Sequence, residues 1–179
     1  GNELDGPWQL GHLSGKEYGR KAAQTAHAMR SLDPNLELIL VGSSGHGQKS
    51  YPDFMRQALD RTYELVDLVS IHQYYGGHDG WTEYGTEDFL GVSLDLEEYL
   101  RGTIATIDHV KARHREKKAV NISLDEWCIW PEIPYESLRL NLVKPWYPAG
   151  GPLAEGAVNF EQFLVGCLYV LTALRHADR

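Results

Sequence analysis

Two carboxylates of this sequence stand where they could do acid and base chemistry. Glu126 closes an apolar run in Leu124-Asp125-Glu126-Trp127, and Glu3 lies near the start in Gly1-Asn2-Glu3-Leu4. A buried ionised carboxylate costs free energy unless it is paired or hydrogen-bonded, so Glu126 is either a structural ion-pair partner or a functional group. Glycoside hydrolysis requires two carboxyl groups with different roles. We therefore take Glu3 and Glu126 as candidate catalytic residues.

Alternating helices and strands are expected to position these glutamates. Apolar residues at helical spacing predict helices over 14–31, 52–64, 94–114 and 154–175, the first capped by Ser14. Short apolar and β-branched runs predict buried strands over 36–42, 66–72 and 119–125. The alternation indicates an α/β fold with parallel strands. No linker or internal repeat indicates a second domain within residues 1–179.

Two long segments, 73–92 and 127–152, break the alternation directly after predicted strands. The first is rich in Tyr, Gly and Asp, and the second in Trp, Pro and Tyr. Barrels and doubly wound folds carry their chemistry in loops at the carboxyl ends of parallel strands. We expect both segments to be loops that surround the two glutamates.

The composition argues against two kinds of partner. The chain has 17 Lys and Arg against 25 Asp and Glu, for a formal net charge of −8, whereas a nucleic-acid surface needs clustered cations. No apolar run reaches the roughly 18 residues of a membrane helix, and no signal peptide opens the chain. Because the sequence opens at Gly1 without Met, we expect the gene product to begin upstream. We predict no nucleic acid and no membrane as partners; sugar-like ligands fit better.

Other motifs with a chemical meaning fail on spacing. The Gly-rich run 41–50 follows a strand and ends in Lys-Ser, but Gln48 separates the last Gly from Lys49, so a plain loop is favoured over a phosphate site. The eight histidines show no metal-ligand spacing, and Cys128 and Cys167 are interpreted as free thiols. A Ser nucleophile lacks its G-x-S-x-G elbow. We predict neither a metal nor a cofactor.

Three segments resemble glycoside hydrolase family 51, the α-L-arabinofuranosidases. They are Gly1-Asn2-Glu3-Leu4-Asp5-Gly6-Pro7-Trp8-Gln9, Ser70-Ile71-His72-Gln73-Tyr74-Tyr75-Gly76 and Leu124-Asp125-Glu126-Trp127. Their order and spacing also agree with the family, and the similarity continues to the final helix. The resemblance implies an incomplete (β/α)8 TIM barrel that runs from the end of strand 4 through helix 7.

The same resemblance implies roles for individual residues. Glu3 would be the acid/base at the end of strand 4, and Glu126 the nucleophile at the end of strand 7. Asn2 would hydrogen-bond the sugar 2-hydroxyl. The other substrate-binding residues that the resemblance implies are His72 and Tyr74 at the end of strand 6 and two aromatic walls, Trp8 and Trp130, whose alternative is core and turn packing.

The implied activity is that of a retaining glycosidase that removes α-L-arabinofuranosyl residues from oligo- or polysaccharides without a cofactor. The resemblance also implies a cytoplasmic homo-oligomer, a hexamer. The sequence departs from the family at Cys128, where Asn is common, and the 131–152 segment does not align. The family's first three strands, part of its strand 4, its strand 8 and its appended β-sandwich lie outside these residues. A non-catalytic carbohydrate-binding or structural fragment, and a related barrel that acts on xylosides or β-glucans, therefore remain as alternatives.

Overall fold

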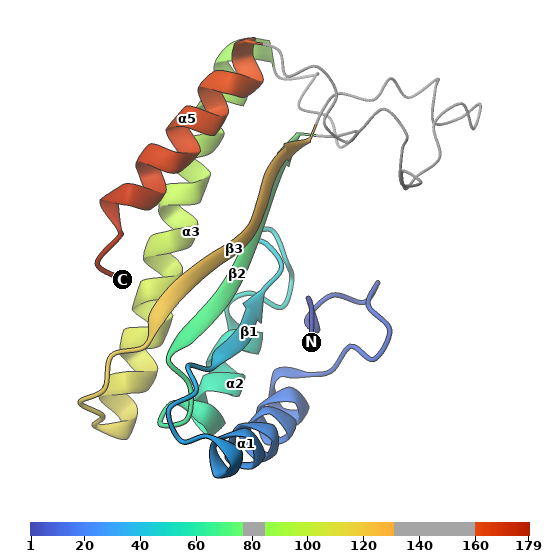
Figure 1. The fold of residues 1–179 in the computed structure, drawn as a ribbon. Coiled ribbons are helices and arrows are strands. Elements are labelled where there is room, and N and C mark those ends of the chain that lie inside the picture. The colour runs from blue at the N-terminus through green and yellow to red at the C-terminus, as the bar shows by residue number, and fades with distance from the viewer. Residues whose placement is uncertain (77–84, 131–159) are drawn as a thin grey trace. The chain divides into compact units, whose positions relative to one another are not determined.

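The computed structural model describes residues 1–76, 85–130 and 160–179. Along the chain the elements are α1 (Gly15–Leu32), β1 (Ile39–Ser43), α2 (Asp53–Thr62), β2 (Leu68–Gly76), α3 (Gly85–His114), β3 (Asn121–Trp130) and α5 (Phe160–Arg175), shown in Figure 1. The chain divides into two compact units. The first unit comprises residues 1–73, 98–126 and 176–179, and the second comprises the described residues of 74–97 and 127–175.

The three strands form one sheet in the order β1-β2-β3. β1 and β2 are parallel, and the arrows in Figure 1 show β3 running in the same direction. Residues Ile39 to Val41 pair in step with β2, and the register then shifts before Ser43. A Cβ at Gly42 would lie 2.4 Å from the Ser70 carbonyl oxygen, so this irregularity needs a glycine. The carboxyl ends of the strands meet at one edge of the sheet, as the sequence predicts.

The two faces of the sheet differ in the first unit. Leu40 and Val69 point into a buried core with Met55 and Leu59 of α2 and Val110 of α3, each at most 1% exposed. Because side chains alternate along a strand, the residues that follow Leu40 and Val69 in their strands point to the opposite face of the sheet. That face carries the polar side chains of β2 and β3 that form the site described below.

Helix α1 begins with the cap that the sequence predicts. The Ser14 hydroxyl accepts a hydrogen bond from the backbone N–H of Glu17, and the Glu17 carboxylate accepts from the backbone N–H of Ser14, which completes a capping box. Hydrogen bonds from the Ser14 side chain and backbone lower the pKa of Glu17. Farther along α1, the buried ring of Tyr18 stacks on Phe54 of α2.

The predicted elements are confirmed, but several of their bounds were wrong. α3 begins at Gly85, so residues 85–92 are helical and not loop; Phe89 and Leu96, two turns apart, are both buried. β2 continues to Gly76 and β3 to Trp130, so the predicted loops begin later. The expected strand-end positions of His72, Tyr74 and Glu126 were therefore wrong, because all three residues lie within their strands. β1 begins at Ile39 rather than at residue 36. The rest of both predicted loops, and residues 154–159 of the last predicted helix, lie outside the described residues.

In the second unit, aromatic rings join β2 and β3 to α5. Tyr169 of α5 is 1% exposed, stacks on Trp127 with ring centroids 4.6 Å apart, and meets the ring of Tyr75 edge-on. Burial raises the pKa of Tyr169, and the charge of Tyr74 adds to this effect. Among the described helices, none has the length and apolar character that crossing a membrane requires.

Candidate active site

Glu3 lies in the segment before α1, and its backbone is in the left-handed region with φ of 45°. Its carbonyl oxygen accepts a hydrogen bond from the N–H of Gly6, which closes a tight turn. A non-glycine residue rarely adopts this conformation, and such residues are found most often at functional sites. The turn sets the direction of the Glu3 side chain, which is 14% exposed.

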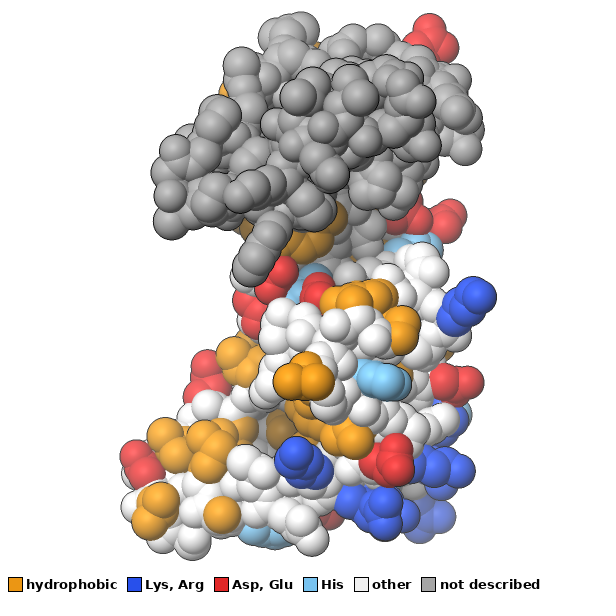
Figure 2. All heavy atoms as spheres, turned by 90° about the vertical axis from the view of Figure 1, so that its right-hand side faces the viewer, with side chains coloured by type: hydrophobic (Ala, Val, Ile, Leu, Met, Phe, Trp, Pro, Cys, Tyr) orange, Lys and Arg blue, Asp and Glu red, His pale blue; other side chains and the backbone are white. Residues whose placement is uncertain are grey.

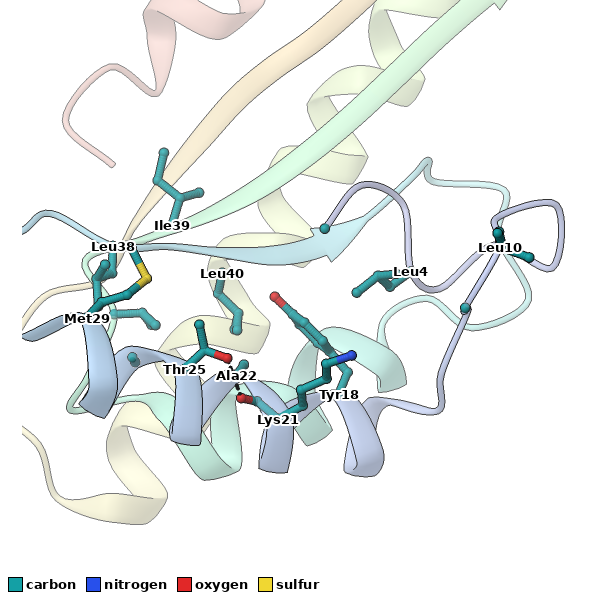
Figure 3. A pocket seen from close by; sticks show the side chains of 14 residues that line it. Leu4, Leu10, Tyr18, Lys21, Ala22, Thr25, Met29, Leu38, Ile39 and Leu40 are labelled. Carbon is teal, nitrogen blue, oxygen red and sulfur yellow. Dashed lines mark hydrogen bonds between the residues drawn. The ribbon is translucent and has the colours of Figure 1, made fainter.

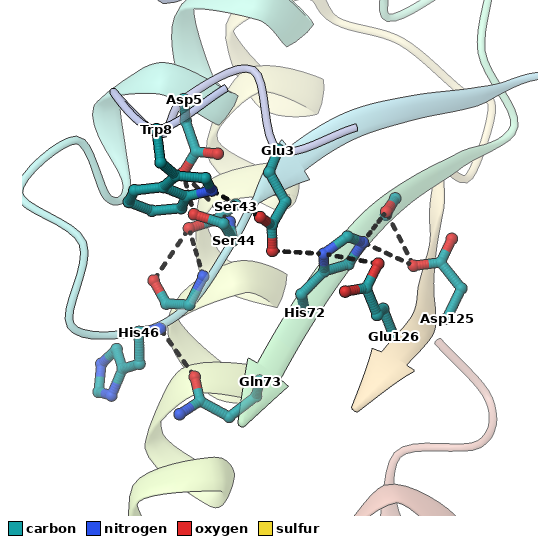
Figure 4. Close-up of polar contacts among 12 residues, drawn as sticks. Glu3, Asp5, Trp8, Ser43, Ser44, His46, His72, Gln73, Asp125 and Glu126 are labelled. Atoms are coloured by element: carbon teal, nitrogen blue, oxygen red, sulfur yellow. Dashed lines mark hydrogen bonds and ion pairs between the residues drawn. The ribbon is translucent and has the colours of Figure 1, made fainter. Parts of the chain in front are cut away.

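Both carboxylate oxygens of Glu3 have partners in the first unit. The indole N–H of Trp8 donates to Oε2 over 2.8 Å, and Nδ1 of His72 lies 3.1 Å from Oε1 (Figure 4). His72 is a buried residue of β2 and is separated from Glu3 by 69 positions.

His72 also reaches the second glutamate. Its Nδ1 lies 3.5 Å from Oε2 of Glu126, a β3 residue of the same unit whose side chain is 40% exposed. One donor atom from each of Glu3, His72 and Glu126 lies within 4.8 Å of the other two. The fold therefore brings the two sequence-predicted glutamates together around one imidazole. A nitrogen and two carboxylate oxygens are also groups that can bind a metal ion.

The other ring nitrogen of His72 faces a second polar group. Nε2 lies 3.4 Å from Oδ1 of Asp125 and 3.4 Å from Oγ of Ser70. The Ser70 hydroxyl donates to the same Asp125 oxygen over 2.8 Å, and the Ser123 hydroxyl donates to Oδ2 over 3.2 Å. Asp125 and Ser70 are functional candidates that the sequence reasoning missed. The available signal was the alternation along β2, which places Ser70 and His72 on one face.

Asp5 ties the Glu3 turn to the loop after β1. Its Oδ2 accepts from the backbone N–H and the hydroxyl of Ser44, at 3.1 and 3.0 Å, and from the hydroxyl of Ser50 at 3.4 Å. Its Oδ1 is buried and has no hydrogen-bond partner among the described residues. The Gly-rich run therefore holds the Glu3 turn in place through these hydrogen bonds to Asp5. The run is itself bound to β2, because Gln73 accepts a hydrogen bond from the backbone N–H of His46.

A cavity of about 400 Å³ opens beside His72 and Glu126. Its polar lining includes Asn2, Ser70, His72, Asp125 and Glu126, and β1 contributes apolar side chains. Asn2 is exposed at this cavity, so an incoming ligand can reach its amide.

The remaining predicted site residues have different surroundings. Trp8 is 54% exposed, as a wall residue would be, but its N–H is bound to Glu3. Tyr74 is half-buried and belongs to the second unit. The backbone of Trp130 ends β3, and its side chain lies outside the described residues. Cys128 is an exposed free thiol and Cys167 a partly buried one.

A second cavity, of about 390 Å³, lies between α1 and the edge strand β1 (Figure 3). Most of its side chains are apolar, among them Leu4, Leu10, Met29 and Ile39, while Lys21 and Thr25 lie on the side of α1. Figure 2 shows hydrophobic side chains exposed among polar ones on the described part of this face. Among the described residues, no acidic side chain lines this cavity.

No family model matches the chain. Individual proteins do. The chain is 43% identical over its whole length to an intracellular exo-α-(1→5)-L-arabinofuranosidase from Bacillus subtilis, of which it covers 34%. It is 43% identical to the protein of the same name from Acetivibrio thermocellus, covering 35%, and 37% identical to an exo-α-(1→6)-L-arabinofuranosidase from Bifidobacterium longum, covering 34%. The chain thus spans about a third of the length of the curated relatives it matches.

Solved structures agree with these relatives. A family 51 α-L-arabinofuranosidase from Bifidobacterium longum aligns with the whole chain at a TM-score of 0.83 and 31% identity, and the chain covers 35% of it. The arabinose complex of an α-L-arabinofuranosidase from Thermotoga maritima aligns with 99% of the chain at a TM-score of 0.72 and 26% identity, and 31% of that protein is covered. Sequence and fold agree along the full 179 residues, and the chain therefore belongs to glycoside hydrolase family 51, the family of these α-L-arabinofuranosidases.

Proposed function

We propose that the full-length protein is a retaining exo-α-L-arabinofuranosidase that removes arabinofuranosyl residues from arabinose-containing oligo- or polysaccharides. The observation that carries this proposal is the placing of Glu3 and Glu126 around His72 Nδ1, at 3.1 and 3.5 Å. Donor oxygens of the two glutamates lie within 4.8 Å of each other. Retaining glycosidases hold their carboxyl groups about 5 to 5.5 Å apart, whereas inverting enzymes need about 6.5 to 9.5 Å to admit a water. The observed spacing favours the retaining mechanism.

In the proposed first step, a carboxylate oxygen of Glu126 forms a bond to the anomeric carbon while the bond from that carbon to the leaving oxygen breaks. Glu3 gives its proton to the leaving oxygen. In the second step Glu3 takes a proton from water, the water oxygen attacks the same carbon, and Glu126 leaves as a carboxylate. Two inversions at one carbon retain the configuration.

The other residues of the site bind the sugar in this proposal. Asn2 lines the cavity beside Glu126 and hydrogen-bonds the sugar 2-hydroxyl. The exposed indole of Trp8 forms one wall, and Trp130 forms a second. His72 and Tyr74 line the subsite beside the nucleophile. All of these groups bind through hydrogen bonds and ring faces, which suits a neutral, polar ligand.

Azide distinguishes the roles of the two glutamates. In the full-length protein, Glu126→Ala should abolish hydrolysis of 4-nitrophenyl α-L-arabinofuranoside, and azide should restore turnover with a product of inverted configuration. Glu3→Ala should retain cleavage of this activated substrate and lose cleavage of alkyl arabinofuranosides, with azide giving a product of retained configuration. Product configuration is read by NMR. Wild-type activity of Glu126→Ala with the nitrophenyl substrate, or of Glu3→Ala with alkyl arabinofuranosides, would remove that residue from the proposed mechanism.

We further propose that residues 1–179 form part of one catalytic (β/α)8 barrel domain, from the end of strand 4 through helix 7. β1 and β3 are the edges of the described sheet, and a closed barrel has no such edges. If the missing strands complete the site, the isolated 179 residues should be inert while the full-length protein is active. Activity of the isolated piece equal to that of the whole would contradict this proposal.

Substrate and assembly are proposed on the same basis. The relatives are named for α-(1→5) and α-(1→6) linkages, so arabinobioses of both linkages, with xyloside and β-glucan substrates as controls, decide the preference.

Because several relatives are named intracellular, we propose a cytoplasmic location for this protein. We also propose that the protein is a homo-hexamer, which light scattering of the full-length protein would measure. We propose no nucleic-acid or membrane partner. Activity after treatment with a chelator should be unchanged, since the two carboxyl groups suffice.

A further inference from the structure

The imidazole of His72 stands between two sets of carboxylates. Nδ1 faces Glu3 at 3.1 Å and Glu126 at 3.5 Å, and Nε2 faces Asp125 at 3.4 Å. A neutral imidazole carries one proton, on either nitrogen, and the partners of one nitrogen decide what the other can do. The His72 side chain is 8% exposed, so these partners, rather than bulk water, decide which ring nitrogen carries the proton.

The contacts around Nε2 favour a proton on that atom. The Ser70 hydroxyl donates its hydrogen to Asp125 over 2.8 Å, so its oxygen is left as an acceptor toward Nε2. Asp125 as a carboxylate offers only acceptors. A bare Nε2 would therefore meet two oxygen lone pairs, whereas Nε2–H meets two acceptors.

The contacts around Glu3 point to Oε1 as the oxygen that carries its proton. The Trp8 indole can only donate, so Oε2 must accept from it. Oε1 is then the oxygen that exchanges a proton with Nδ1 of His72, 3.1 Å away. When this proton is on Nδ1, His72 is an imidazolium beside the Glu3 carboxylate. When it is on Oε1, His72 is neutral and Glu3 is a carboxylic acid. Nε2 keeps its own proton in both cases.

We propose that Asp125, together with Ser70, is a positioning residue that keeps a proton on Nε2 of His72, so that the Nδ1 proton is the one that passes to Glu3. This inference rests on the proposed role of Glu3 as the acid. With Nε2–H held by Asp125, His72 remains a stable neutral ring after Nδ1 gives up its proton, and Glu3 becomes the carboxylic acid that the leaving oxygen requires.

Replacing Asp125 by Asn tests this arrangement with little change of shape. The amide can turn an N–H toward Nε2, which stabilises the opposite tautomer with the proton fixed on Nδ1. Nδ1–H then donates to Glu3 as a carboxylate, and the acid form of Glu3 is lost. A substrate with a poor leaving group needs this acid, whereas an activated aryl substrate hardly does.

The experiment measures kcat/KM of the full-length protein with α-L-arabinofuranosides whose leaving groups range from 4-nitrophenol through phenol to methanol. For Asp125→Asn we expect a fall of about 10- to 100-fold with the methyl glycoside but only about 3-fold or less with the nitrophenyl glycoside. Ser70→Ala should shift the dependence on the leaving group in the same direction. Asp53→Asn, an exposed carboxylate of α2 outside the site, should leave it unchanged.

The outcomes separate this inference from the proposed function. If the wild-type protein hydrolyses no arabinofuranoside, the proposed function fails. If the wild-type protein is active, a second outcome decides the inference. The positioning role is overturned, while the function stands, if Asp125→Asn and Ser70→Ala leave kcat/KM unchanged or lower it by one common factor for all substrates. A disturbed Glu126 would give such a common factor, because it would slow every substrate equally. Should Asp125→Asn not fold by circular dichroism, Ser70→Ala decides alone.

Discussion

The indole nitrogen of Trp8 lies 2.8 Å from Oε2 of Glu3, so an aromatic residue beside the proposed acid is also its hydrogen-bond donor. The sequence suggests Trp8 only as an aromatic wall of the pocket. Trp8 is 54% exposed, while its N–H is bound to Glu3. One side chain can therefore bind substrate and fix the orientation of the acid.

Two substitutions at Trp8 separate these contributions. Trp8→Phe keeps a ring and loses the N–H, and Trp8→Ala loses both. Because a hydrogen bond to a charged or acidic group is worth about 1.5 to 3 kcal/mol, we expect Trp8→Phe to lower kcat for alkyl arabinofuranosides about 10- to 100-fold with little change in KM. Trp8→Ala should raise KM as well. An unchanged kcat in Trp8→Phe would leave Trp8 as a wall alone.

Local patterns predicted the helices and strands, although several of their bounds were wrong, and the roles of Glu3 and Glu126 stay predictions. Helical periodicity and strand composition are properties of neighbouring residues, so the elements could be predicted directly. The end of β3 was not predicted, because the strand continues past Glu126 to Trp130. The start of α3 was missed because residues 85–92 carry few periodic apolar residues, and the helix there is supported by burial of Phe89. Tertiary burial outweighed local propensity at that point.

The contacts of the site could not be predicted in the same way. Ser70 and Asp125 are 55 positions apart and meet only because β2 and β3 are neighbours in a particular register. The reach of Trp8 to Glu3 depends on the left-handed backbone of Glu3, which no propensity favours for glutamate. The fold decides which side chains meet across neighbouring strands and which residues adopt a strained turn. Residue types alone do not predict either.

The link between Asp5 and Ser44 should measure how far the Glu3 turn depends on the loop after β1. Asp5 accepts two hydrogen bonds from Ser44, at 3.1 and 3.0 Å, and its other oxygen is buried. We expect Asp5→Ala to lower the free energy of unfolding by about 2 kcal/mol and Ser44→Ala by about 1 kcal/mol. The double variant should lose less than the sum, because the two residues share contacts. Strict additivity in denaturant unfolding would show that they act independently.

Gly15 lies where α1 approaches α2 closely. A Cβ built there would lie 2.5 Å from the carbonyl oxygen and 2.9 Å from the Cα of Phe54, both backbone atoms, so the helices must move apart to admit it. We expect Gly15→Ala to destabilise the protein by about 1 to 3 kcal/mol, despite the better helix propensity of alanine. Gly91→Ala, in α3 with no described residue outside its own turn of helix within 4 Å of its Cβ position, should be neutral or gain up to about 1 kcal/mol. Equal melting temperatures for the two variants would contradict the packing argument.

Asp67 should make stability depend on pH, because it joins three parts of the first unit. Its carboxylate accepts from Arg30, Lys118 and the backbone N–H of Leu38, each at 2.8 Å. Burial raises the pKa of Asp67, but the hydrogen bonds from Lys118 and Leu38 and the charges of Lys118 and Arg30 outweigh it, so the pKa is lowered.

A lowered pKa in the folded state means that Asp67 stabilises the protein above the pKa of the unfolded chain, about 3.9, and loses this effect as the pH falls through the folded value. We expect Asp67→Asn to cost about 2 kcal/mol at pH 7. The difference in melting temperature from wild type should shrink below about pH 4, as the wild-type carboxyl takes up its proton. Asp53→Asn, at an exposed pair with Arg56, should change stability by less than about 1 kcal/mol at pH 7. If Asp67→Asn lowers the melting temperature equally at pH 7 and pH 3, the loss comes from shape and neutral hydrogen bonding, and the charge of Asp67 contributes nothing.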